Sequence, residues 1–145
     1  SYPNCNNQHL HSDGSGLFSS AIDSILPTHA VILGIPLIDL SEQNGTTEVW
    51  PESHIKGKDV AKSYKPFLKK GDCYIMDYRL LHRGLANNSN DLRTIIFIRY
   101  ALPWWRDIAN FRRSITSKEK ALPIIITKNN LQNIPKDLKY LFRYF

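Results

Sequence analysis

Four short runs rich in β-branched and aromatic residues, each bounded by turn residues, constrain this chain more than any other feature. Residues 30–40 are nearly all apolar, which is typical of a strand buried on both faces, and Pro36 implies a bulge or an edge position. Asn44 and Gly45 form a turn signal for positive φ, and residues 46–50 follow as a second strand. Together these features predict a hairpin.

Two further strands are predicted nearer the C-terminus. Residues 92–102 have the clearest strand pattern of the chain, which ends at Pro103. Residues 73–82 form an extended run whose alternate side chains share one face: Tyr74, Met76, Tyr78, Leu80 and His82. Short strands with little helix up to residue 105 favour a mainly β fold, a cupin-like double-sheet jelly roll, also called a double-stranded β-helix. The pattern alone leaves sandwich and barrel open.

The basic residues are concentrated at the C-terminal end. Residues 1–103 contain ten Lys/Arg and ten Asp/Glu, whereas residues 104–145 contain nine and three, so the net charge of +6 lies there. We expect a jelly-roll core in residues 1–105 and a basic extension in residues 106–145, with helical stretches at 107–115 and 135–145, that packs on the core or on a partner. A solvated basic face explains this charge more simply than nucleic-acid binding does.

Composition argues for an intracellular globular protein. The longest apolar run, residues 30–38, is interrupted by Gly34 and Pro36 and is too short to cross a bilayer, and residues 1–8 lack the apolar segment of a secretory signal. The chain has two cysteines, Cys5 and Cys73, which do not make a disulfide framework. Reduced thiols and a cytoplasmic location are therefore predicted.

Residues 8–14 carry a motif with clear chemical meaning. In an extended segment, His11 and Asp13 project to the same side, so both can reach one ion. A second histidine would complete a 2-His-1-carboxylate triad, which holds non-haem Fe(II) and leaves coordination positions open, and the chain offers His82. His9 lies four residues from Asp13, a spacing that suits a helix, and is the alternative ligand.

Other residues follow this motif in a definite order. They are Asn44-Gly45, Trp50-Pro51-Glu52-Ser53-His54, Gly71-Asp72, Leu80-Leu81-His82-Arg83-Gly84, Asn87, and Arg93, which lies eleven residues beyond His82. In this order and at this spacing, residues 8–105 resemble the phytanoyl-CoA dioxygenase family of Fe(II)/2-oxoglutarate-dependent oxygenases. Two positions depart from the family pattern, since Trp50 and Glu52 stand where the family often has an aliphatic residue and glycine.

The resemblance implies a cofactor, two co-substrates and a reaction. Fe(II) would be held by His11, Asp13 and His82, and 2-oxoglutarate and O2 would be the co-substrates. The expected outcome is hydroxylation of a small-molecule substrate with release of succinate and CO2. Related halogenases have a small residue in place of the carboxylate, so Asp13 argues for oxygenation.

The resemblance also assigns an arginine to the co-substrate. A planar guanidinium binds a carboxylate through two charge-assisted hydrogen bonds, and Arg93 stands at the family's position for this role. We expect the strands of Arg93 and His82 to lie in facing sheets about 10 Å apart, with the diacid between them. Arg99 has the same parity along an ideal strand, so spacing alone does not exclude it.

Several polar residues are predicted to line the site. Gln8 stands at the family's glutamine position and Thr46 follows the Asn-Gly turn, so both are predicted to contact 2-oxoglutarate. Thr47 has the same chemistry as Thr46, although β-strand propensity already explains both threonines. His54 is expected to shape the pocket wall rather than to bind metal.

Few residues precede the His-x-Asp motif, whereas family members carry helices and at least one sheet strand before it. We therefore expect an open sheet edge that a missing N-terminal segment, a replacement strand, or a second chain in a homo-oligomer would cover. Two other functions are considered: a non-catalytic jelly-roll binding module that retains the metal motif, and a nucleic-acid-associated protein. The latter would not require a facial triad.

Overall fold

The computed structural model describes residues 1–14, 16–56, 62–105, 107, 130 and 132–137. The chain divides into two compact units, Ser1–Trp105 and Arg106–Phe145. All elements below belong to the first unit. The helical stretches expected in the extension fall almost entirely outside the described residues, and its packing on the core or on a partner stays a prediction.

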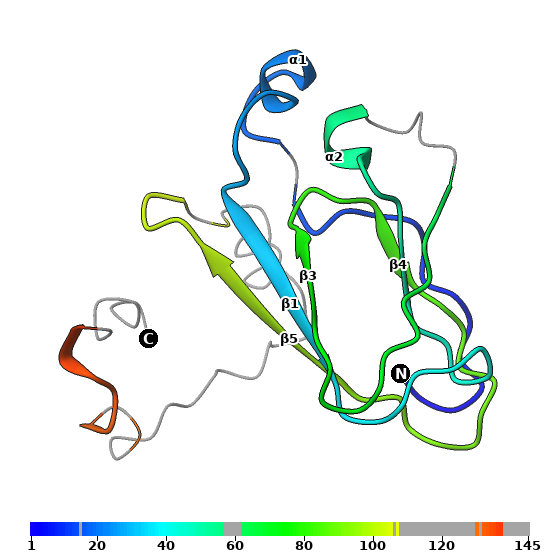
Figure 1. The fold of residues 1–145 in the computed structure, drawn as a ribbon. Coiled ribbons are helices and arrows are strands. Elements are labelled where there is room, and N and C mark those ends of the chain that lie inside the picture. Colours follow the sequence, from blue (N-terminus) through cyan, green and yellow to red (C-terminus); the bar gives the residue numbers. More distant parts are fainter. Residues whose placement is uncertain (15, 57–61, 106, 108–129, 131, 138–145) are drawn as a thin grey trace, which may run out of the picture. The chain divides into compact units, whose positions relative to one another are not determined.

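Within the described ranges, five strands form two antiparallel sheets (Figure 1). The first sheet has β1 (Ala30–Pro36) between β3 (Tyr74–Asp77) and β5 (Ile95–Ala101). The second sheet pairs β2 (Thr47–Val49) with β4 (His82–Gly84). The strands are rich in isoleucine, valine, threonine and aromatic residues, whose side chains pack well on a pleated surface.

Backbone pairs extend the second sheet on both sides. Residues 8–11 run beside β4, where His11 and His82 exchange two hydrogen bonds of 3.0 and 2.8 Å. On the other side, Val49 of β2 and Tyr64 exchange bonds of 2.9 and 2.7 Å. The segment that carries the His-x-Asp motif is thus fixed against β4 by the main chain.

Two single-turn helices lie beyond one end of the strands (Figure 1). They are α1 (Ser20–Asp23) and α2 (Ser53–Lys56). The Asp23 carboxylate accepts the N–H groups of Leu17 and Phe18 at 2.9 and 3.1 Å, which fixes the loop before α1. None of the helices in the described ranges has the length and apolar character of a membrane span.

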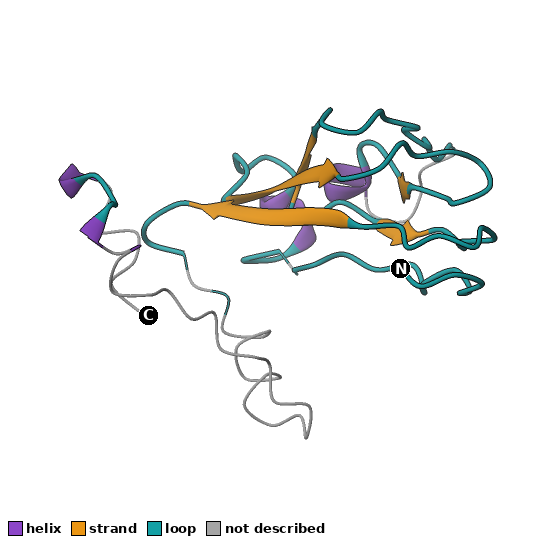
Figure 2. Ribbon diagram, turned by 90° about the horizontal axis from the view of Figure 1, so that it is seen from below, coloured by secondary structure: helices purple, strands orange, loops and turns teal. Residues whose placement is uncertain are grey.

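The core lies on one face of the three-stranded sheet, which Figure 2 shows almost edge-on. Along β1 the side chains alternate between buried and half-buried, so the prediction of burial on both faces is wrong. On the opposite face Ile75 and Tyr100 are 68% and 57% exposed. The core residues on the buried face are Ala30, Ile32, Met76, Tyr78 and Leu80, against which Val49, Tyr74 and Trp105 pack.

The predicted hairpin between β1 and β2 is also wrong. The turn itself forms, since Ser41 and Gly45 make a bridge and Gly45 has φ +77°. However, β1 pairs with β3 and β5, whereas β2 pairs with β4 in the other sheet. The chain therefore crosses between sheets after this turn, because both edges of β1 are already paired, one with β3 and the other with β5.

The run at residues 73–82 crosses between sheets in the same way. It turns after β3 and enters β4, yet burial of alternate side chains continues through Met76, Tyr78, Leu80 and His82. The mainly β fold is thus confirmed. The finer assignment to a double-stranded β-helix stays a prediction, which the two sheets and the crossings between them support.

Candidate metal centre

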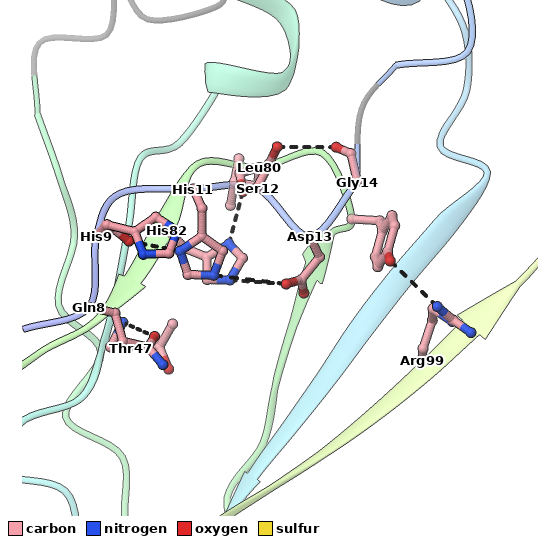
Figure 3. Close-up of polar contacts among 12 residues, drawn as sticks. Gln8, His9, His11, Ser12, Asp13, Gly14, Thr47, Leu80, His82 and Arg99 are labelled. Atoms are coloured by element: carbon pink, nitrogen blue, oxygen red, sulfur yellow. Dashed lines mark hydrogen bonds and ion pairs between the residues drawn. The ribbon is translucent and has the colours of Figure 1, made fainter. Parts of the chain in front are cut away.

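Two imidazoles and one carboxylate converge beside β4 (Figure 3). They belong to His11, Asp13 and His82, and one ligand atom from each lies within 4.8 Å of the others, a grouping that could hold one metal ion. Asp13 Oδ1 lies 3.6 Å from His82 Nε2 and 4.0 Å from His11 Nε2. The structure therefore brings together the three residues predicted as ligands, and metal binding by them stays a prediction.

Backbone pairing explains why these side chains meet. His11 and His82 lie directly opposite each other in an antiparallel ladder, so their side chains project to the same face. Asp13 follows two residues after His11 on the same side. The next residue is Gly14, where a Cβ would overlap the Tyr78 ring, so glycine lets the motif lie close to the core.

Hydrogen bonds set the tautomers of both histidines. His11 Nδ1 lies 2.8 Å from the carbonyl oxygen of His9, and His82 Nδ1 lies 3.0 Å from that of Leu80. Because a carbonyl only accepts, each Nδ1 must carry the proton, and each Nε2 presents its lone pair. Burial lowers the pKa of His82, which favours the neutral ring that a metal ligand requires. This donor set fits Fe(II).

His9 does not belong to this group of three. Its side chain is exposed, and its ring centroid lies 4.9 Å from that of His11. Its contribution to the site is the backbone carbonyl that orients the His11 ring. The alternative in which His9 is a ligand therefore has no support in the geometry.

Arg93 is buried, with 5% of its surface exposed. Its Nη1 donates to the carbonyls of Asn44 and Leu85 at 2.7 and 2.8 Å, and its Nη2 donates to Ser1 Oγ at 2.7 Å. In the part of the chain that the structure describes, no carboxylate pairs with it. Burial lowers the pKa of Arg93, because desolvation penalises the charged form. A bound anion would compensate this buried charge.

The position of Arg93 relative to the three candidate ligands follows from β4. Gly84 lies two residues after His82, about 7 Å along the strand. A Cβ on Gly84 would come within 2.8 Å of Gln8 Oε1 and 3.5 Å of Arg93 Nη2, so glycine leaves space for both groups. Arg93 itself precedes β5 by two residues. The strands of Arg93 and His82 were expected in different sheets, and this agrees with the structure, because β5 and β4 belong to different sheets. The guanidinium itself reaches Gly84 of β4, and the separation of about 10 Å stays a prediction.

Arg99, which spacing alone could not exclude, lies elsewhere. It belongs to β5, and its guanidinium carbon is 5.8 Å from the Tyr78 ring centroid and 5.5 Å from that of Trp105. Its Nη1 also contacts the Tyr78 hydroxyl at 3.4 Å (Figure 3). Arg93 is consequently the candidate anchor for a carboxylate.

The two other predicted co-substrate contacts differ in their geometry. Gln8 accepts the Gly84 N–H through Oε1 at 2.8 Å, which leaves its amide NH2 to donate. Thr46 is fully buried and donates its hydroxyl to the Pro66 carbonyl, which argues against a co-substrate contact. Its neighbour Thr47 is the register partner of Gly84 and lies on the face that carries the candidate ligands.

Tyr74 was not predicted as a site residue. Its hydroxyl donates to Thr47 Oγ1 at 2.9 Å, and burial raises the pKa of its phenol. The sequence did contain a signal, because Tyr74 has the same parity as His82 in the alternating run.

Comparison with known proteins identifies the family. Residues 2–95, which include the three candidate ligands and Arg93, match the model of the phytanoyl-CoA dioxygenase (PhyH) family. The chain belongs to this family. PhyH proteins are oxygenases that use Fe(II), 2-oxoglutarate and O2, so the predicted family and cofactors are confirmed at this level.

Solved structures agree with the fold. AviO1 from Streptomyces viridochromogenes Tue57 is 24% identical, with a TM-score of 0.58 over 71% of this chain and 47% of that chain. EvdMO1 is 25% identical, with a TM-score of 0.57 over 70% and 25%. The non-heme monooxygenase ThoJ, in a complex with nickel, is 24% identical, with a TM-score of 0.55 over 72% and 40%. This PhyH chain thus spans less than half of each of these three proteins.

Proposed function

We propose that this PhyH chain forms the iron site of a 2-oxoglutarate-dependent dioxygenase that hydroxylates a small molecule and releases succinate and CO2. One observation carries the proposal. Three ligand atoms of His11, Asp13 and His82 lie within 4.8 Å of one another, and both imidazoles are oriented by backbone carbonyls. If the His-x-Asp motif were only a solvated turn, its histidine would not need a carbonyl that orients the ring, and neither would His82.

Each residue has a role in this proposal. His11 and His82 bind the metal as neutral imidazoles through Nε2, and Asp13 supplies one negative charge, so a divalent ion retains a net charge of +1. Arg93 binds the far carboxylate of 2-oxoglutarate, and the amide NH2 of Gln8 donates to the same molecule. Fe(II) held by these three residues would supply the activation of O2 needed for decarboxylation of the co-substrate and hydroxylation of the substrate.

A cavity of about 390 Å³ offers space for the small-molecule substrate. Val49, Met76 and Leu80 contribute apolar side chains to its wall, and Val49 is the register partner of His82. This wall is suited to holding an apolar substrate.

Anaerobic spectroscopy tests the proposal directly. Fe(II) and then 2-oxoglutarate are added to the purified 145-residue chain, and the expected result is the weak visible charge-transfer band of the chelate. His82→Ala should abolish the band. His9→Ala is the matched control, since it removes a neighbouring imidazole that is not in the group, and it should retain the band.

The opposite results would reject the proposal. A wild-type spectrum without the band, identical to that of His82→Ala, would favour the non-catalytic binding module. Loss of the band in His9→Ala, with retention in His82→Ala, would show that the ligand set is wrong.

A further inference from the structure

The cavity of about 390 Å³ is lined by residues of both sheets. Val49 of β2 and Met76 of β3 contribute side chains to its wall, and so does Ile75, the neighbour of Met76. Neighbouring residues of a strand project to opposite faces, so the cavity continues around the edge of β3 that does not pair with β1. Its volume lies at the low end of the range of about 300–1,000 Å³ that small-molecule sites occupy.

The cavity also adjoins the backbone that holds one candidate metal ligand. Leu80 lines the cavity, and its carbonyl oxygen lies 3.0 Å from His82 Nδ1. The next residue, Leu81, donates its N–H to Ser53 Oγ at 2.8 Å. Ser53 begins α2, so the side chain that follows it, His54, is fixed beside the segment that leads to His82.

The described part of the cavity wall contains no lysine or arginine. Strand alternation explains this. Val49 and Tyr64 form a bridge and both line the cavity, so their neighbours Glu48 and Lys65 project to the opposite face of this sheet. On that face Glu48 accepts a hydrogen bond from Arg83 Nε at 2.7 Å. The cations of this sheet are therefore turned away from the cavity.

This distribution of charge disfavours an anionic ligand. The charged groups in the described wall are two carboxylates, those of Glu52 and Asp77. Asp77 is already paired with Arg79, at 2.9 Å. A carboxylate or phosphate that entered the cavity would lose water without gaining a positive partner from the described wall, which is costly. An uncharged molecule does not meet this cost.

His54 provides one polar group on the wall. Its Nδ1 is buried and has no hydrogen-bond partner in the part of the chain that the structure describes. Its Nε2 is not buried in this way, so Nε2 is the nitrogen that a ligand can reach. A nitrogen of a neutral imidazole donates or accepts according to the tautomer, and a hydroxyl group can do both. A ligand with a hydroxyl group would therefore pair with either form of His54.

We propose that this cavity binds an uncharged, mainly apolar small molecule whose hydroxyl group forms a hydrogen bond with His54. The assignment of this molecule as the substrate rests on the proposed function. Binding itself needs no iron, so it can be measured on the metal-free chain.

The single methionine of the sequence gives a direct test, because Met76 lines the cavity. Its methyl group is labelled with carbon-13, and its NMR signal is followed while the metal-free chain is titrated with 1-octanol, octanoate or octylammonium. These probes share one alkyl chain and differ in the head group. We expect 1-octanol to shift the signal until it saturates, and octanoate to bind at least about tenfold more weakly.

Replacement of His54 tests its hydrogen bond. His54→Phe keeps a ring but removes both nitrogens, so the affinity for 1-octanol should fall about three- to tenfold. His54→Gln places an amide near the position of Nε2 and should retain most of the affinity. The matched control is His9→Phe, which removes an exposed imidazole outside the cavity wall and should change nothing.

Replacement of Ile75 tests the charge argument even if the His54 variants do not fold. Ile75 is 68% exposed and lines the cavity, so Ile75→Lys should fold and bring a cation to its mouth. The preference for 1-octanol over octanoate should then narrow. Ile96→Lys makes the same change at an exposed position of β5 outside the wall, and the preference should stay as in wild type.

The outcomes separate this inference from the proposed function. A Met76 signal that none of the probes shifts to saturation would overturn the inference, as would equal affinity for 1-octanol and octanoate or tighter binding of octylammonium. Equal 1-octanol affinity in wild type and His54→Phe would overturn the role of His54. Normal 1-octanol binding in a chain that lacks the charge-transfer band would reject the proposed function, and the cavity would remain a binding site without a role in the reaction.

Discussion

The Asp77–Arg79 ion pair holds the turn that leads from β3 to His82. Asp77 accepts three hydrogen bonds from Arg79, from the backbone N–H at 2.8 Å, from Nε at 3.0 Å and from Nη2 at 2.9 Å. Arg79 Nη1 also donates to the carbonyl of Asp23 at 2.9 Å, which ties the turn to α1. Both side chains of the pair are nearly buried, with 12% and 7% exposed.

The pair makes stability depend on pH. Burial alone would raise the pKa of Asp77, but hydrogen bonds from Arg79 and Thr28 lower it from 3.8 to about 2. Because the folded pKa is depressed, the stabilisation is fully present above the unfolded pKa and is lost as the pH falls through the folded pKa. The shift corresponds to about 2 kcal/mol at neutral pH, of which about 1 kcal/mol is lost at about pH 3.

Replacement of Asp77 by asparagine should remove this pH dependence. The free energy of unfolding is measured by urea titration with circular dichroism at several pH values from neutral to about 3. At neutral pH the variant should be less stable by about 2 kcal/mol or more, because a nearly buried arginine loses its carboxylate. Toward acid pH the difference between wild type and variant should narrow by about 1 kcal/mol.

A double variant provides the control. Asp77→Asn with Arg79→Gln removes both charges, so it should recover part of the lost stability while it retains the weaker pH dependence. Stability curves for wild type and Asp77→Asn that run parallel from neutral to acid pH would refute the linkage argument.

Two further predictions concern backbone with positive φ. Gly45 and Gly71 have φ of +77° and +90°, but a Cβ on Gly45 would overlap the Ala86 carbonyl and Arg93 Nη1, whereas one on Gly71 would meet nothing within 4 Å. Gly71→Ala should therefore lower the free energy of unfolding by about 1 kcal/mol. Gly45→Ala should lower it more and should also weaken 2-oxoglutarate binding. Equal losses of unfolding free energy in the two variants would contradict this reasoning. Glu52 has φ +66°, so Glu52→Gly should raise the free energy of unfolding by up to about 1 kcal/mol, and a decrease in the same urea titration would contradict the strain argument.

The local parts of the site could be predicted from sequence. The i, i+2 spacing of His11 and Asp13 reflects strand geometry, and the family resemblance supplied His82 and Arg93. The departure at Glu52 was also visible, and the φ of +66° at this residue explains why the family often has glycine there.

Register and topology could not be predicted in the same way. Thr46 and Thr47 are adjacent in an extended segment, so they project to opposite faces, and the sequence did not indicate that Thr47 is the one on the face of the candidate ligands. The Asn44-Gly45 signal identified a turn but carried no information about which sheet the next strand would join. The contact of Tyr74 was overlooked because its partner, Thr47, comes from the other sheet.

The spacing between the candidate ligands and Arg93 has an evolutionary consequence under the proposed function. The groups proposed to bind the two ends of the diacid are both positioned by one strand, β4. His82 of the metal group and Gly84, which borders Arg93, are two residues apart on it. Inserting one residue would turn the following side chains to the other face, and inserting two would add about 7 Å, far more than one methylene. Insertions in β4 would therefore change the length of the diacid that fits only in large steps. Under the proposed function, single mutations in β4 could not shift the preference gradually from 2-oxoglutarate to a slightly longer or shorter diacid.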